Sequence, residues 1–302
     1  MTRICDYEGS HYRTDFWEGQ NREYEDCIER IAMRKLLPPQ GQRIIEIGAG
    51  FGRLADLYHG YRQVILNDYA RTQLEEARNY LGRNSRFVYV VSDVYSMPFV
   101  DNLFDTLTMV RVMHHLVDVP AALTEIHRLL APNGTAVIEY ASKFHLKSIL
   151  RWLVGRQSWS PFDPTPYEFV ELNFNFHPAW MRRQFKKVGF EIKNVRSLSY
   201  LRINLLKRLL PTFLLVTLDN WAQPTGDWWQ LSPSQFVRAQ AQKSPAPLPL
   251  DFFRCPICHS TQLVRTQPNP DFTSEELLIC QGCQRHWSFC DGIYDFKTPV
   301  DS

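Results

Sequence analysis

Apolar and polar positions follow two periods along the first half of the chain. Between residues 28 and 140, continuous apolar runs alternate with stretches whose apolar residues recur every three or four positions. Continuous runs are typical of strands covered on both faces, and the longer period is typical of amphipathic helices. The runs lie at 42–48, 62–68, 86–93, 104–112 and 135–140, and the helical stretches at 52–59, 70–81 and 120–130. The alternation predicts an α/β fold with a doubly wound, mainly parallel sheet.

The regular alternation stops at residue 141. Residues 141–176 are rich in aromatic residues and prolines, and we expect a lid there. Its rings are candidates for an apolar acceptor pocket or for a small core of the lid itself: Trp152, Trp159, Phe162, Tyr167, Phe174 and Phe176. A helical pattern at 177–190 and a strand-like pattern at 191–201 follow, and an insertion at 202–230 precedes a last strand at 232–241.

The segment "QKSPAPLPLD" at 242–251 is the clearest domain boundary. It is rich in proline and alanine, which is typical of a linker. The sequence therefore predicts an N-terminal helical cap (1–39), a main domain (40–241), this linker and a small C-terminal domain (252–302).

The stretch "IIEIGAGFGRL" at 44–54 breaks a β-branched strand into a glycine-rich loop. Its glycines, Gly48, Gly50 and Gly52, give G-x-G-x-G, whereas a dinucleotide fingerprint requires G-x-G-x-x-G. Arg53 stands where the third glycine of that fingerprint would fall. Glycines here let the backbone approach a ligand closely, and the ligand is not the usual dinucleotide.

Three carboxylates stand at the ends of the first three predicted strands. Glu46 precedes the glycine loop, where a carboxylate would repel a pyrophosphate but would attract a cation. Asp68 is placed to accept bonds from ribose hydroxyls, and Asp93 from an adenine amino group. Together they indicate a ligand with adenosine at one end and a positive centre at the other, which describes S-adenosylmethionine (SAM).

Five ordered motifs carry a family resemblance: "EIGAGFGRL", "NDYA", "SDVYSMPF", "FDTLTMVRVMHHL" and "EIHRLLAPNGTAVI". In this order they resemble the class I SAM-dependent methyltransferases, in particular the group with a His-His pair after the fourth strand. The resemblance covers roughly residues 40–240 and implies a seven-stranded, Rossmann-like sheet whose final strand is antiparallel. The cofactor-binding residues that it implies are Glu46, Gly48, Ala49, Gly50, Gly52, Asp68, Tyr69, Asp93, Val94 and Arg111.

His114 and His115 are the candidate catalytic bases. Imidazole titrates near neutrality, and a base helps when the acceptor carries a proton. The alternative is a structural pair with one ring packed under the cofactor loop. In the N-terminal segment, Tyr12, Trp17 and Arg22 are candidates for ligand contact, with core packing as the alternative.

Seven cysteines are distributed unevenly, and five of them fall after residue 250. Cys255 and Cys258 form one C-x-x-C pair, and Cys280 and Cys283 form another, which predicts a structural Zn²⁺ site. The run "LICQGCQRHWSFCDGIYDF" resembles the zinc-ribbon activator subunit of tRNA, rRNA and release-factor methyltransferases, although "WSF" replaces that family's usual Tyr-Pro-Ile. This resemblance implies a fused partner docked on the main domain, and a simple folding staple is the alternative.

Composition and charge narrow the function further. The chain has 302 residues, 44% of them hydrophobic, and a net charge of +2. The segment 182–208 contains nine Lys or Arg residues and one acidic residue. This excess of positive charge is compatible with an anionic partner or with a solvated helix face. The run 209–218 is too short and too polar to span a bilayer, and the N-terminus lacks an apolar signal core, so we expect a cytoplasmic protein.

Three functions remain open at this point. The first is methyl transfer to a small-molecule, lipid or secondary-metabolite acceptor, favoured by the aromatic lid. The second is tRNA methylation, suggested by the ribbon, the His-His pair and the basic stretch. The third is a SAM-binding scaffold without catalysis, against which the acids at 46, 68 and 93 argue.

Overall fold

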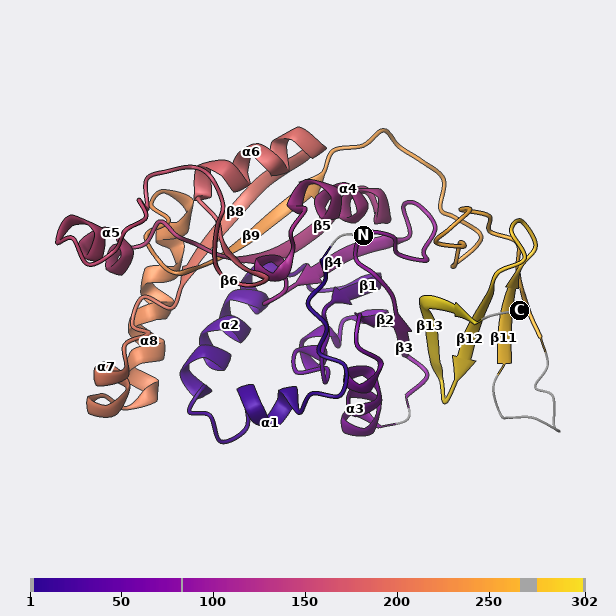
Figure 1. Ribbon diagram of the computed structural model, residues 1–302, viewed down its shortest axis with the longest axis horizontal. Helices are drawn as coiled ribbons and strands as arrows, with labels where there is room; N and C mark the ends of the chain where they lie inside the picture. The colour runs from indigo at the N-terminus through magenta and orange to yellow at the C-terminus, as the bar shows by residue number, and fades with distance from the viewer. Residues whose placement is uncertain (1–2, 83, 267–275, 301–302) are drawn as a thin grey trace.

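One continuous sheet runs through the whole molecule (Figure 1). The computed structural model describes residues 3–82, 84–266 and 276–300. The sheet has the strand order β10-β11-β12-β13-β3-β2-β1-β4-β5-β9-β8. A separate hairpin pairs β6 (Tyr167–Val170) with β7 (Asn173–Asn175).

Seven of these strands form the main domain. They are β1 (Gly41–Ile47), β2 (Tyr61–Asp68), β3 (Phe87–Val91), β4 (Phe104–Met109), β5 (Leu130–Ala141), β8 (Phe190–Leu198) and β9 (Ser234–Ala241). The strands β3, β2, β1, β4 and β5 are parallel, and β9 is antiparallel to both β5 and β8. The predicted Rossmann-like, mainly parallel seven-stranded sheet with a final antiparallel strand is confirmed.

Helices cover both faces of this sheet (Figure 1). On one face lie α4 (Val119–Leu129) and α6 (Pro178–Val188). The helices of the other face are α2 (Glu23–Leu36), α3 (Arg71–Leu81) and α8 (Thr212–Ala222). The remaining helical segments are α1 (Tyr12–Phe16), α5 (Leu146–Leu153), α7 (Asn204–Leu209), η1 (Ala55–Tyr58), η2 (Met113–His115) and η3 (Gln223–Asp227). Among the described residues, no helix is both long and apolar enough to cross a bilayer.

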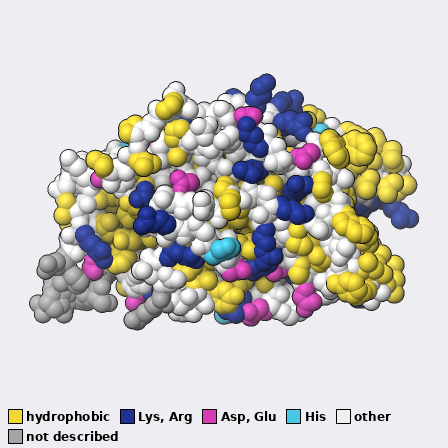
Figure 2. Space-filling view, turned by 180° about the vertical axis from the view of Figure 1, so that it is seen from behind, with side chains coloured by type: hydrophobic (Ala, Val, Ile, Leu, Met, Phe, Trp, Pro, Cys, Tyr) yellow, Lys and Arg dark blue, Asp and Glu magenta, His cyan; other side chains and the backbone are white. Residues whose placement is uncertain are grey.

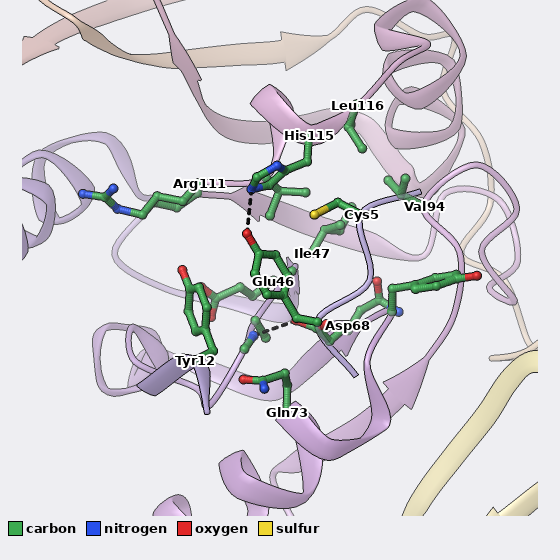
Figure 3. A pocket seen from close by; sticks show the side chains of 18 of the residues that line it. Cys5, Tyr12, Glu46, Ile47, Asp68, Gln73, Val94, Arg111, His115 and Leu116 are labelled. Atoms are coloured by element: carbon green, nitrogen blue, oxygen red, sulfur yellow. Dashed lines mark hydrogen bonds between the residues drawn. The ribbon is translucent and has the colours of Figure 1, made fainter. Parts of the chain in front are cut away.

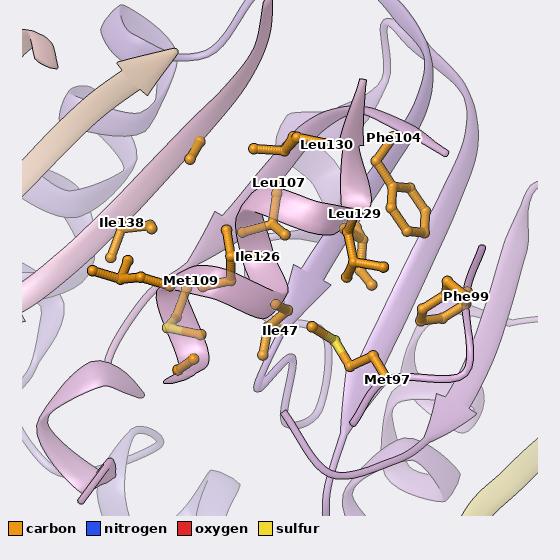
Figure 4. Close-up of a cluster of buried hydrophobic side chains, with 14 of the residues drawn as sticks. Ile47, Met97, Phe99, Phe104, Leu107, Met109, Ile126, Leu129, Leu130 and Ile138 are labelled. Atoms are coloured by element: carbon orange, nitrogen blue, oxygen red, sulfur yellow. The ribbon is translucent and has the colours of Figure 1, made fainter. Parts of the chain in front are cut away.

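Successive residues of the central strands serve two separate cores. Ile44 packs with α2 and α3, whereas its neighbour Ile45 packs on the α4 side, as the alternation of side chains along a strand requires. The core on the α4 side joins Leu107 of β4 to Ile126 of α4, and both residues are fully buried (Figure 4). Burial on both faces explains the continuous apolar runs of the sequence.

The sequence predicts a helix at 52–59, and the structure shows that this prediction is wrong. The chain forms turns followed by the short 3-10 helix η1. Gly52, the first residue of the predicted helix, has a φ of +76°, which a right-handed helix does not contain.

The cysteine-rich segment extends the sheet instead of standing apart from it. Its strands are β10 (Leu263–Arg265), β11 (Glu276–Cys280), β12 (His286–Cys290) and β13 (Ile293–Val300). These four are antiparallel to one another, and β13 pairs parallel with β3, with Ile293 opposite Tyr89 and Asp295 opposite Val91. Trp287 and Phe296 belong to the same buried core as α4. The predicted boundaries of the four parts of the chain stay predictions.

Candidate functional site

A pocket opens where the carboxyl ends of β1, β2 and β4 meet (Figure 3). Ligands bind at this edge of open parallel sheets. Its walls come from the N-terminal segment, the glycine loop and the turns after β2, β3 and β4. The predicted cofactor residues that line it are Glu46, Gly48, Ala49, Gly50, Asp68, Tyr69, Asp93, Val94 and Arg111. Gly52 does not line it; a Cβ there would lie 2.9 Å from Leu81 on α3.

The glycine loop is tightly held against the pocket. The backbone nitrogen of Gly48 donates to the Asn67 carbonyl oxygen at 2.8 Å, which joins the loop to β2. A Cβ at Gly48 would lie 2.1 Å from Val112 Cγ2, so a larger residue cannot occupy this position without displacing the turn after β4. The loop backbone can therefore approach a ligand directly.

Glu46 is a buried carboxylate at the bottom of the pocket. Its Oε2 atom has no hydrogen-bond partner among the described residues. Burial raises the pKa of Glu46 to about 8, and the nearby Arg53 offsets this only in part. A buried carboxyl oxygen without a hydrogen-bond partner is costly, and a cationic group in the pocket would relieve that cost. The site therefore fits a ligand with a positive centre.

Asp68 and Asp93 have oxygen atoms available to ligand donors. Asp68 accepts from the backbone nitrogens of Gly50 at 2.8 Å and Ala70 at 3.0 Å, which fixes its orientation (Figure 3). Asp93 Oδ1 accepts from the nitrogen of Tyr95 at 2.9 Å. Burial raises the pKa of both carboxyls. Each can still accept further bonds, because a carboxylate offers about four lone-pair sites.

Arg111 turns its guanidinium away from the pocket (Figure 3). Its side chain pairs with the buried Glu29 of α2, and its backbone nitrogen donates to Glu139 at 3.0 Å. Glu29 also holds Arg53 at 2.7 Å, and the ring of Trp17 lies 3.7 Å from the Arg53 guanidinium carbon. These contacts fix α2 and the glycine loop to the turn after β4. The structure places Trp17 and Tyr12 in the pocket wall, and Arg22 outside it.

The two histidines have different surroundings. His115 lines the pocket, and its Nδ1 lies 2.9 Å from the Leu172 carbonyl oxygen. A carbonyl oxygen only accepts, so Nδ1 carries the proton and Nε2 is free to accept. The Tyr7 hydroxyl lies 3.2 Å from that Nε2 and therefore donates to it. Burial lowers the pKa of His115, which favours the neutral ring.

His114 packs behind its neighbour instead of facing the pocket. The two rings have centroids 4.1 Å apart, and His114 is absent from the pocket wall. Burial lowers the pKa of His114 well below its usual range, and His115 and Arg111 lower it further. The roles of the two histidines stay predictions.

Sequence reasoning missed Cys5 and Tyr7, which line the pocket from the N-terminal segment. Burial raises the pKa of the Tyr7 hydroxyl, so it stays protonated and remains a donor. The sequence offers only isolated polar and aromatic residues here, because an extended segment has no period that would identify its inner face. The lid aromatics, by contrast, lie outside the wall and pack on one another, as Trp159 on Tyr167 at 4.8 Å.

The four predicted metal ligands meet in the C-terminal module. The sulfur atoms of Cys255, Cys258, Cys280 and Cys283 all lie within 4.8 Å of one another. The Cys258 and Cys280 sulfurs are 3.4 Å apart, and those of Cys255 and Cys283 are 3.7 Å apart. Four thiols gathered from two C-x-x-C turns form a donor set that fits tetrahedral zinc.

The module also contacts the pocket. Lys297 of β13 lies 4.0 Å from the ring centroid of Tyr69, and its Nζ pairs with Asp6 at 2.8 Å. Arg71 at the start of α3 donates to the Cys290 carbonyl oxygen at 3.2 Å and lies 3.6 Å from Asp295. The cysteine-rich segment thus supports both Tyr69 and the N-terminal segment that closes the pocket.

Comparisons with known proteins agree with this geometry. Residues 45–138 match a family model described as a methyltransferase domain. A demethylmenaquinone methyltransferase of Clavibacter sepedonicus is 32% identical over 115 residues, which is 37% of this chain and 47% of the relative. The O-methyltransferase cnsE of Penicillium expansum is 27% identical over 147 residues, or 45% of this chain and 52% of the relative. The chain thus spans about half the length of these curated relatives.

Solved structures share the fold at low sequence identity. A putative SAM-dependent methyltransferase of Listeria monocytogenes has a TM-score of 0.53 at 16% identity, covering 73% of this chain and 99% of its own. A complex of the Haloferax volcanii Trm112 methyltransferase activator with a putative methyltransferase gives 0.53 at 17% identity, covering 80% and 100%. Membership of the His-His group stays a prediction. Residues 45–138 thus match a methyltransferase domain, and the main sheet has the fold of solved SAM-dependent methyltransferases.

Proposed function

We propose that this protein transfers a methyl group from SAM to a small organic acceptor. The observation that carries the proposal is the buried Glu46 in the pocket wall, whose Oε2 has no hydrogen-bond partner among the described residues. It suits the cationic end of SAM, and Asp68 and Asp93 would accept from the ribose hydroxyls and the adenine amino group, with Tyr69 and Val94 in the same pocket wall. Bound SAM supplies an electrophilic methyl group on a sulfonium. The curated relatives carry names of menaquinone and O-methyltransferases, which favours a small-molecule acceptor.

The Tyr7–His115 pair is the proposed base. An acceptor hydroxyl that attacks the methyl carbon must lose its proton, and Nε2 of His115 is placed to take it directly or through Tyr7. His114 has a positioning role in this proposal, because it supports the His115 ring from behind. His115→Asn should therefore lower kcat at unchanged SAM affinity. His114→Asn is the matched comparison and should retain more activity; equal losses in both would contradict the assignment to His115.

The C-terminal segment is proposed to be a zinc ribbon fused to its own methyltransferase domain. Cys255, Cys258, Cys280 and Cys283 would hold the metal, and the β13–β3 pairing would keep the ribbon against the domain. In this division of the chain the cap is 1–39, the catalytic domain 40–241, the linker 242–251 and the ribbon 252–302. The contact of Lys297 with Tyr69 is compatible with both roles of the ribbon, the folding staple and the activator.

RNA methylation is the second candidate. It is favoured by the ribbon, by the Haloferax structure that contains an activator, and by the basic residues at 182–208. The scaffold without catalysis is the third and needs the same SAM pocket. All three predict SAM binding, so the acceptor assay decides among them.

The test is transfer of a labelled methyl group from SAM into a cell extract, followed by solvent extraction, RNase and protease treatment. Label in the solvent layer supports the small acceptor, and label lost with RNase would favour the RNA alternative. No transfer at all, with SAM binding intact, would contradict an enzymatic function. Asp68→Ala should abolish SAM binding, whereas Asp163→Asn is the matched control because Asp163 lies outside the pocket; retained affinity in Asp68→Ala would exclude this cofactor site.

A further inference from the structure

One end of the molecule exposes many large apolar side chains. This apolar end is formed by α5, α7, α8 and residues 228–229, and Figure 2 shows hydrophobic side chains gathered there. Three tryptophans stand out: Trp221 is 73% exposed, Trp228 is 76% and Trp229 is 69%. The other exposed members are Leu146, Leu150, Leu153, Leu205, Leu209 and Phe213. Single exposed apolar residues are ordinary, but a group of this size marks an interaction surface.

The elements of the apolar end adjoin one another. The nitrogen of Leu146, at the start of α5, donates to the Leu231 carbonyl oxygen at 3.0 Å, next to the exposed tryptophan pair. The helix η3, which leads into Trp228, packs against α8, and α8 follows α7 after two residues. The exposed side chains therefore belong to one continuous region.

Two helices of the apolar end bury polar groups and expose apolar ones. In α5, Ser148 is buried and bonded to Gln157 at 2.9 Å, while Leu150 and Leu153 face outward. In α8, Asp219 is fully buried and accepts from the Tyr24 hydroxyl at 2.6 Å, while Phe213 is 71% exposed. A surface helix normally has the opposite arrangement. Packing of the core therefore does not explain why these helices expose apolar residues.

Basic side chains accompany these apolar residues. Lys147, Arg151, Arg156 and Arg208 are exposed and make no ion pair with any residue that the structure describes. No acidic residue occurs in α5 or α7, and Asp219 is the one acid of α8. Tryptophan and leucine beside unpaired cations suit the boundary between anionic headgroups and acyl chains.

We propose that the apolar end docks on the surface of an anionic lipid bilayer. The tryptophans and leucines would enter the headgroup–acyl boundary, and the four cations would face lipid phosphates. A second copy of the chain is a poorer occupant, because a two-fold contact would bring the same unpaired cations together. None of the apolar-end residues lines the pocket, so the inference stands apart from the proposed methyl transfer.

The test is co-flotation of the full chain with vesicles of phosphatidylcholine, with and without phosphatidylglycerol. We expect binding that requires phosphatidylglycerol and weakens with salt. The double substitution Lys147→Gln/Arg151→Gln should weaken it about tenfold or more, since each cation contributes about 1 kcal/mol at such a surface. Trp228→Ser/Trp229→Ser should weaken it to a similar extent, about tenfold.

The matched control is Leu248→Ser/Leu250→Ser, which removes two exposed leucines from the linker, away from the apolar end. A circular dichroism spectrum and a thermal unfolding midpoint like those of the parent chain show that each variant is folded. The proposal is overturned by absence of binding, by binding that ignores phosphatidylglycerol, or by variants that float like the parent chain. A dimer in sedimentation that the tryptophan substitutions dissociate would also overturn it, in favour of a second copy.

Discussion

The two ends of the long sheet bury their apolar residues in opposite ways. At the ribbon end, Trp287 and Phe296 lie inside a core that continues onto α4. At the apolar end, Trp221 and Trp228 lie outside, while Asp219 lies inside. The ribbon end buries its large apolar side chains inside the protein, and the apolar end exposes its own to solvent.

The difference follows from what each end has available for packing. The ribbon is a small module with few core residues of its own, so it joins β3 and gathers four cysteines. The apolar end is built on a large, complete sheet and does not need its outward residues for folding. Side chains there can serve recognition, because stability comes from elsewhere.

Loss of one proposed zinc ligand should unfold the ribbon end. Cys280→Ser removes a buried thiol from the cluster, and structural zinc contributes about 10 kcal/mol or more to folding of such modules. We expect loss of bound zinc and an early thermal transition, measured by metal analysis and circular dichroism. Cys27→Ser, an exposed cysteine far from the cluster in sequence, is the control. Full zinc content in Cys280→Ser would contradict the proposed ligand set.

The pocket lies between the two ends and responds to pH through Glu46. Because burial raises the pKa of Glu46 to about 8, this carboxyl holds its proton below that pH, and binding of cationic SAM must expel it. SAM affinity should fall as pH decreases from about 8 to 6, by up to about tenfold per pH unit. The unliganded protein should lose stability as pH rises through about 8.

Glu46→Gln separates the Glu46 effect from other titrations. It should bind SAM weakly at all pH values, and calorimetry should show a flatter pH profile than in the parent chain. The decline in stability towards pH 8 should also become smaller, as measured by urea unfolding. An unchanged profile in Glu46→Gln would mean that another group controls the pH dependence.

The stability of the apolar end should depend on its buried polar group, Asp219, and not on its exposed aromatic rings. Asp219→Ala leaves the Tyr24 hydroxyl and the Tyr200 nitrogen without their acceptor, and should cost about 1–3 kcal/mol in the free energy of unfolding. Trp221→Ser, two residues away and exposed, should change it by less than about 0.5 kcal/mol. If urea unfolding ranks the two variants in the opposite order, the comparison of the two ends is wrong.

The smallest effect concerns communication between the ribbon and the pocket. Lys297→Met removes a cation over the Tyr69 ring and its pair with Asp6, a contact that contributes about 0.5–1 kcal/mol. We expect SAM affinity to fall about two- to fivefold by calorimetry. Lys193→Met, an exposed lysine of β8, should leave it unchanged. Equal affinities would show that the ribbon supports folding without influencing the pocket.

Sequence reasoning succeeded where chain order and strand ends determine position. Glu46 lies near the end of β1, Asp68 ends β2 and Asp93 follows β3, and the carboxyl ends of such parallel strands meet at one edge of the sheet. It failed where distant segments meet without a periodic signal, as Tyr7 does with His115 across 108 positions. The pairing of β13 with β3, which sets Ile293 opposite Tyr89, was missed for the same reason: no periodic signal in the sequence connects these two strands.

The bridge from Asp6 through Lys297 to Tyr69 also bears on synthesis of the protein. A ribosome makes residues 3–241, with the whole main sheet, well before it makes residue 297. The nascent domain therefore folds with the outer wall of its pocket unsupported, and the pocket gains its last contact when β13 adds to β3. The pocket is therefore completed only after the ribosome has made β13, late in the synthesis of each molecule.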